Sequence, residues 1–82
     1  MEEFGFDKAI RLLKEGYKVA RKGWNGKKMY ITLIPSGNSM FFGCNMQDCI
    51  GIRTPNGEMQ PGWNASQADM LEDDWTVYKG GK

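Results

Sequence analysis

The chain has 82 residues, which is enough for one small domain with a modest core, and domains of this size often gain stability by assembling. Eleven basic residues are interspersed with ten acidic ones, which argues against a nucleic-acid binder that relies on phosphate neutralisation. No apolar run approaches the roughly 20 residues that cross a bilayer, and the N-terminus lacks the features of a signal peptide. We therefore expect a single cytoplasmic domain over residues 1–82, with no membrane or nucleic-acid partner.

The N-terminal half contains signals for one helix and two strands. Residues 6–15 carry apolar side chains at the i, i+3, i+4, i+7 spacing of a helix, and Gly16 is a natural C-terminal stop. Residues 17–21 alternate as a strand does, and residues 23–27 read as a turn. Lys28 to Ile34 is the strongest predicted strand, and both of its faces are largely apolar. We expect one face to pack on the helix and the other on a second subunit.

The segment after residue 38 predicts short strands and a hairpin. Residues 40–42 suit a short strand. Strands at residues 50–54 and 58–60 flank the pair Asn56-Gly57, which is a strong hairpin signal.

The last part of the chain predicts a short helix and a final strand. Asn64 or Ser66 can cap a helix that ends at Leu71, and residues 75–79 close as a strand. This order of elements predicts an α+β fold, in which a mainly antiparallel sheet packs on the N-terminal helix with a short second helix beside it.

The chain lacks much of the usual equipment for catalysis. It contains no histidine, so no Ser-His or Cys-His nucleophile can be built, and it has no phosphate-binding Walker pattern. Cys44 and Cys49 would need carboxylate partners such as Asp48 to hold a metal, and a disulfide is not supported by other signs of secretion. We expect reduced thiols, no metal and no cofactor. For Asp73-Asp74 we expect a solvated or ribose-contacting loop rather than a catalytic pair.

The tripeptide Gly-Trp-Asn occurs twice, at residues 23–25 and 62–64. In the first copy, Trp24 offers a stacking face for a base, and Asn25 suits a ribose hydroxyl. Nearby cations suit phosphate oxygens: Arg21, Lys22 and Lys27. The alternative is a glycine-rich turn pinned to the core by one large aromatic side chain.

The second copy leads into the short predicted helix. Ser66, Asp69 and Met70 lie three or four positions apart and share a face, with Gln67 beside them. These polar groups can read hydroxyls and a base edge, while Met70 and Trp63 can supply an apolar wall.

A purely structural alternative also fits this helix. Ser66 would cap it, Asp69 would serve its first turn, and Met70 would join the core. For Leu71 and Trp75 we expect the core position because of their apolar spacing.

Together, the two tryptophan motifs, the hairpin between them and the run from Trp63 to Trp75 resemble the second type of Thoeris anti-defence protein, a family of small phage and prophage proteins. The resemblance covers roughly residues 4–79, and residues 39–49 are the part that does not match. It implies a molecular sponge that acts in the cytoplasm of the infected bacterium. Such a protein binds a cyclic ADP-ribose isomer, glycocyclic ADP-ribose, without cleaving it, so the NAD-depleting Thoeris effector receives no signal.

The resemblance also implies an assembly and a set of ligand-binding positions. Family members form homotetramers with nucleotide pockets between paired protomers, and some also hold cyclic dinucleotides at separate sites. The matching positions are Arg21, Trp24, Asn25, Trp63, Ser66, Gln67, Asp69 and Met70. From side-chain chemistry we expect Trp24, with Trp63, to stack on adenine and Arg21 to engage the pyrophosphate. Two alternatives stay open: an enzyme that degrades the nucleotide signal, and a protein–protein adaptor whose tryptophans anchor an interface.

Overall fold

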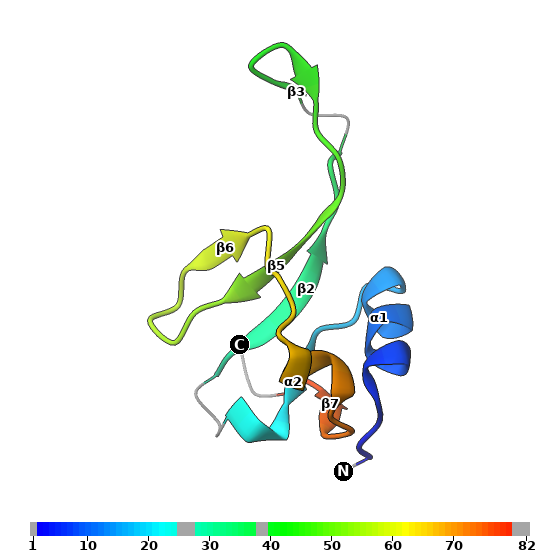
Figure 1. The fold of residues 1–82 in the computed structure, drawn as a ribbon. Helices are drawn as coiled ribbons and strands as arrows, with labels where there is room; N and C mark the ends of the chain where they lie inside the picture. The colour runs from blue at the N-terminus through cyan, green and yellow to red at the C-terminus, as the bar shows by residue number, and fades with distance from the viewer. Residues whose placement is uncertain (1, 25–27, 38–39, 80–82) are drawn as a thin grey trace.

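The computed structural model describes residues 2–24, 28–37 and 40–79, and it has the α+β architecture expected from the sequence (Figure 1). In chain order the elements are α1 (Phe6–Lys14), β1 (Val19–Arg21), the 3-10 helix η1 (Lys22–Trp24), β2 (Tyr30–Ile34), β3 (Met40–Phe41), β4 (Cys44–Asn45), β5 (Cys49–Arg53), β6 (Met59–Pro61), α2 (Gln67–Leu71) and β7 (Trp75–Val77). Among the described residues, no helix is long and apolar enough to cross a membrane.

A five-stranded sheet with the order β6-β5-β2-β1-β7 forms the body of the molecule. Each neighbouring pair is antiparallel, as predicted. The pairing of β2 with β5 is the longest, and it sets Ile31 opposite Ile52. On the other side of β2, Ile31 lies opposite Val19 of β1. The register therefore gathers branched apolar side chains on one face of the sheet.

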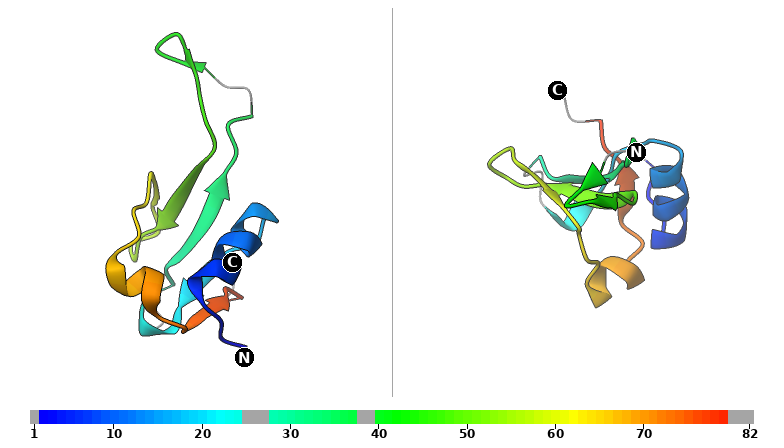
Figure 2. Two further views of the ribbon diagram at one scale, coloured as in Figure 1. Left: turned by 45° about the vertical axis from the view of Figure 1, so that its right-hand side comes forward. Right: turned by 90° about the horizontal axis from the view of Figure 1, so that it is seen from above.

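Helix α1 covers that apolar face. It packs against β1, β2 and β7 and touches α2 (Figure 2). Asp7 lies in its first turn and Lys14 in its last, as the helix dipole prefers. The helix ends one residue earlier than predicted, and Gly16 follows with a φ of +96°, where glycine avoids the strain that a side chain would add. The fully buried core consists of Ala9, Leu13, Val19, Ile31 and Trp75.

The opposite face of the sheet is only partly covered by the chain itself. Tyr30, Thr32 and Ile34 alternate with the buried Ile31 along β2 and are half-buried. The Tyr30 ring stacks at a tilt on Tyr78, with centroids 4.7 Å apart. Near the other end of the face, Ile34 packs over Gly51, where a Cβ atom would approach its Cδ1 to 2.5 Å. Whether a second subunit covers the rest stays a prediction.

Beyond β2 and β5 the chain continues into a narrow two-stranded projection, which we call the arm (residues 40–48, Figure 1). The expected short strand at 40–42 is present as β3, and β4 is an element that the sequence did not predict. The arm turns through Phe42 and Gly43, both with positive φ, as a type I′ hairpin turn requires. Every residue of the arm is exposed. It contributes to the elongated shape of the molecule, 42 × 26 × 22 Å.

Candidate functional site

The two tryptophan motifs, far apart in the sequence, meet on the buried Trp75. The ring centroids of Trp24 and Trp75 lie 5.4 Å apart, and those of Trp63 and Trp75 lie 6.2 Å apart. Trp24 and Trp63 also contact each other at 6.5 Å. Phe6 of α1 completes the group, 5.4 Å from Trp75. We call these four side chains the aromatic cluster.

Members of the cluster differ in exposure. Trp75 is completely buried, and its Nε1 donates a hydrogen bond to the Asp69 carbonyl oxygen at 2.8 Å, so its predicted core position is confirmed. Trp24 and Trp63 are half-buried against the core. In the three tryptophan pairs the rings meet at 74° to 83°, so no indole covers the face of another by parallel stacking. The outer two indoles are therefore anchored by the core while remaining partly open to solvent.

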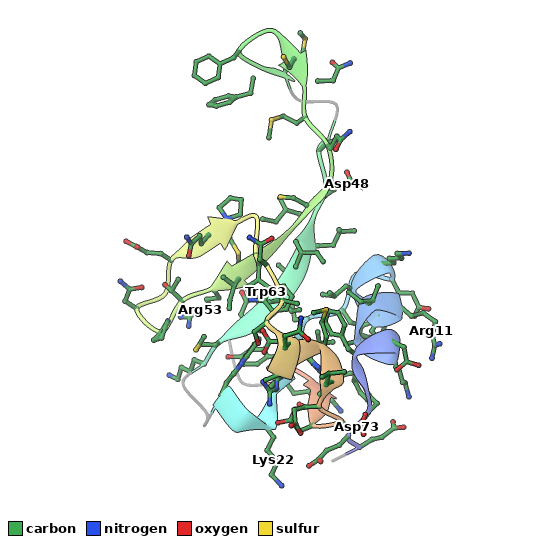
Figure 3. All side chains as sticks on the ribbon, viewed as in Figure 1. Arg11, Lys22, Asp48, Arg53, Trp63 and Asp73 are labelled. Atoms are coloured by element: carbon green, nitrogen blue, oxygen red, sulfur yellow. The ribbon has the colours of Figure 1, made fainter. Side chains whose placement is uncertain are left out.

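Backbone contacts fix the segment that carries Trp63. The N–H groups of Gly62 and Trp63 both donate to the carbonyl oxygen of Ile50 on β5, at 2.9 Å and 2.8 Å. Gly62 has a φ of +83°, a conformation that glycine adopts without strain. Figure 3 shows Trp63 in the middle of the molecule, between the sheet and α2.

A charged network lies beside the cluster and is centred on Arg21. Its Nε donates to Asp74 Oδ1 at 2.9 Å, and its Nη1 donates to Asp69 Oδ1 at 3.0 Å. A longer contact of 3.4 Å joins Nη2 to Asp74 Oδ2, which also accepts the Gly23 N–H at 3.0 Å. The Arg21 side chain is only 14% exposed. We call Arg21, Asp69 and Asp74 the ion triad.

Within the triad, Arg21 and Asp74 shift each other's pKa. The hydrogen bonds from Arg21 lower the pKa of Asp74; burial opposes this effect, and the Gly23 N–H reinforces it. In turn, the hydrogen bond to Asp74 raises the pKa of Arg21, burial lowers it, and Asp69 adds to the rise. Both groups are thus held in their charged forms. Asp73 is exposed, as expected. Asp74 is only partly exposed because Arg21 binds it at the edge of the core, so the solvated alternative is wrong for Asp74, and the ribose-contacting alternative stays a prediction.

Helix α2 begins with a reciprocal capping box. The Asp69 N–H donates to Ser66 Oγ at 3.1 Å, and the Ser66 N–H donates to Asp69 Oδ2 at 2.9 Å. The capped-helix interpretation of these two residues is therefore confirmed. Asp69 joins the cap to the ion triad, since its two carboxylate oxygens serve Ser66 and Arg21 respectively.

The outer side of α2 is exposed and partly apolar. Gln67 and Met70 lie there and are accessible to a ligand. The prediction that Leu71 fills the core is wrong, because it is 75% exposed. Helix α2 has only five residues. The apolar spacing had predicted a buried position for both Leu71 and Trp75, and only Trp75 has one.

Other residues named from the sequence lie outside the aromatic cluster and the ion triad, or outside the described residues. Asn25 and Lys27 lie outside the described residues. Lys22 is exposed and forms an ion pair with Glu3 at 3.3 Å. Both cysteines are free thiols, as expected. Within the described ranges, no three cysteine or acidic side chains gather as a metal site would require.

Sequence reasoning missed two contributors to the site. Phe6 was expected only as part of the helix's apolar stripe, and Asp74 was not recognised as the partner of Arg21. The contact between Asp74 and Arg21 spans 53 positions, so no local pattern signals it.

Comparison with known proteins places this arrangement in a family. Residues 4–78 match the family model for the Thoeris anti-defense 2-like domain, described as Tad2-like, and the match includes the arm. The protein named Thoeris anti-defense 2 from Bacillus phage SP01 is 32% identical over 85 aligned residues, covering 92% of this chain and 94% of the phage protein. This similarity supports an anti-defence role for the chain. The chain belongs to the Thoeris anti-defense 2-like family, which confirms the resemblance found in the sequence.

Proposed function

We propose that the protein inhibits Thoeris by binding a cyclic ADP-ribose isomer, glycocyclic ADP-ribose, and holding it unaltered. The observation that carries the proposal is the convergence of Trp24 and Trp63, both half-buried, on the buried Trp75. Stacking of a base on an aromatic side chain contributes about 1–3 kcal/mol. Indoles held by a core lose little freedom on binding, and a cyclic ligand loses little as well, so both favour tight capture.

The other residues of the site are proposed to orient the stacked ligand. Gln67 and Met70 lie exposed on α2, four and seven positions after Trp63, and suit a polar and an apolar contact. The family resemblance supplies the further positions Arg21, Asn25, Ser66 and Asp69. Of these, the structure gives Ser66 and Asp69 a capping function that keeps α2 in place.

Sequestration without catalysis agrees with the chemistry beside the cluster. The chain has no histidine, and the ionisable side chains beside the cluster are already paired. Asp69 and Asp74 each accept a hydrogen bond from Arg21, which keeps them from serving as a free general base. We therefore propose a binding protein and not an enzyme.

Self-association, with four copies in the complete assembly, is part of the proposal. Residues 40–47 of the arm carry no charge, and an isolated two-stranded hairpin is marginally stable in water. Phe42 at its tip is 91% exposed with a φ of +52°, which is costly for a bulky residue. A partner surface would offset both costs. The partly open sheet face offers a second pairing surface, and two different two-fold contacts generate a tetramer.

The decisive experiment tests whether the protein binds the ligand and releases it unchanged. The protein is incubated with glycocyclic ADP-ribose, the complex is separated from free ligand and heated, and the released molecule is analysed. Recovery of unchanged nucleotide together with a ligand-dependent rise in melting temperature is the expected result. A cleaved product would favour the nucleotide-degrading enzyme. No change in melting temperature with either this nucleotide or a cyclic dinucleotide would favour a protein–protein adaptor.

A further inference from the structure

We infer that Asp74 and Arg21 are positioning residues that hold Trp24 in place, and that neither contacts the nucleotide. The inference refines the proposed site by removing Arg21 from the expected pyrophosphate contacts. Its affinity test rests on the proposed function, whereas a second test on the free protein does not.

Asp74 binds the short segment that ends in Trp24 through hydrogen bonds. Its carboxylate accepts hydrogen bonds from the Arg21 side chain and from the Gly23 N–H. Its carbonyl oxygen accepts the Lys22 N–H at 3.0 Å. One residue thus binds three consecutive residues immediately before Trp24, so its loss would free the indole to move.

The close approach explains the glycine of the first motif. A Cβ atom at Gly23 would lie 3.1 Å from Asp74 Oδ2 and 3.3 Å from Arg21 Nη2. Both distances are tighter than ordinary van der Waals contact. Gly23 therefore lets the Asp74 carboxylate approach and bind the backbone, and this function of the glycine needs no ligand.

The same network reaches the second motif. Arg21 donates to the Asp69 carboxylate, which also caps α2, and the Asp69 carbonyl oxygen accepts the Trp75 indole N–H. The segment of Trp24, the start of α2 and the buried Trp75 are thereby tied to one set of charged hydrogen bonds. Such networks fix geometry when each member is satisfied.

The charge of the triad argues against a phosphate contact. One guanidinium faces two carboxylates, so its positive charge is already more than balanced within the protein. A pyrophosphate approaching Arg21 would meet the two acidic groups as well and would be repelled. Under the proposed function, the phosphates would therefore be bound by groups other than Arg21.

The affinity test compares Asp74→Asn with Asp73→Asn, a matched control because Asp73 is the exposed neighbour and loses the same charge. Binding of glycocyclic ADP-ribose and of phosphate-free adenosine is measured by calorimetry. We expect Asp74→Asn to weaken both ligands by a similar factor, about tenfold or more, and Asp73→Asn to change neither. Unchanged affinity in Asp74→Asn would overturn the inference, and so would a loss confined to the phosphate-bearing ligand. If the wild-type protein binds neither ligand, it is the proposed function that fails.

The free-protein test uses the three indole N–H resonances in a nitrogen–proton NMR spectrum, assigned with Trp24→Phe. The Trp24 resonance should shift and broaden in Asp74→Asn and remain in place in Asp73→Asn. A Trp24 resonance unmoved by Asp74→Asn would contradict the inference. A spectrum that collapses throughout would also contradict it, since that outcome means a general structural role. Arg21→Lys, which keeps the charge but loses the fork of donors, should reproduce the Trp24 shift.

Discussion

Trp24 meets Trp75 edge to face, at an interplanar angle of 78° and a centroid distance of 5.4 Å. A completely buried ring thus supports a half-buried one, so substitutions of the two rings should have different effects.

Trp24→Ala should remove nucleotide capture while the protein remains folded. The variant loses the stacking face, but the five fully buried core residues are unchanged. Calorimetric titration with glycocyclic ADP-ribose measures the first effect, and circular dichroism on heating measures the second. Trp24→Phe, which keeps a smaller stacking face, should retain part of the affinity. If Trp24→Ala instead unfolds, with binding lost only in proportion, the indole is a core element.

Trp75→Phe should lower the free energy of unfolding by about 1–3 kcal/mol. The change leaves a gap in the core and deprives the Asp69 carbonyl oxygen of its 2.8 Å hydrogen bond. Urea denaturation followed by far-ultraviolet circular dichroism gives the value. Leu71→Ala is the control: because Leu71 is exposed, its change should stay within about 0.5 kcal/mol. A larger loss at Leu71 than at Trp75 would mean that α2 packs differently from the structure.

Ser66→Ala should cost about 1 kcal/mol of stability, because the Asp69 N–H loses its partner at the start of α2. Ser66→Thr keeps a hydroxyl in the same place and should be nearly neutral. Urea denaturation distinguishes the two. Equal stability of Ser66→Ala and the wild type would show that the capping box contributes little in solution.

Asp74 should make stability fall in acid. Its pKa is lowered in the folded state, so the carboxylate stabilises the fold above about pH 4, and this contribution disappears as the pH drops through the lowered value. In Asp74→Asn the fall in acid should be shallower, and the free energy of unfolding at pH 7 should be lower by about 1–3 kcal/mol. Urea titrations from pH 7 to about pH 2 test this. Asp73→Asn should follow the wild-type curve.

Phe42→Gly should weaken self-association without damaging the protomer. Glycine accepts the φ of +52° at this turn better than phenylalanine does, while the exposed apolar tip is lost. Light scattering after size-exclusion chromatography should report a smaller assembly. Tyr17→Ser, which removes an exposed aromatic from the body, is the control and should leave the mass unchanged. A Phe42→Gly variant with the wild-type mass would exclude the tip as an association surface.

Local signals predicted the parts of the fold that depend on neighbouring residues. The Asn56-Gly57 signal produced the expected turn, in which Gly57 has a φ of +90° and Thr54 N–H donates to Glu58 O at 2.8 Å. The apolar stripe of residues 6–15 likewise predicted helix α1. The repeated tripeptide marked Trp24 and Trp63 as related positions, although nothing in its spacing predicted their shared contact with Trp75.

The parts that sequence could not supply depend on distant partners. The choice of Trp75 rather than Leu71 for the core was decided by packing against α1 and β1, not by helical periodicity. The partial burial of Asp74 depends on Arg21, which comes from the distant strand β1. Strand β4 has two residues and no alternation of its own, so only its pairing with β3 defines it.

The pairing of β1 with β7 also has a consequence for folding during synthesis. The ribosome synthesises the segment before Trp24 well before Asp74 and Trp75, which hold and support it. A nascent or prematurely terminated chain that stops before Asp74 lacks this fastening. If the protein captures a nucleotide as proposed, capture should require a chain that includes Asp74 and Trp75, and a fragment that ends before Asp74 should not bind the ligand.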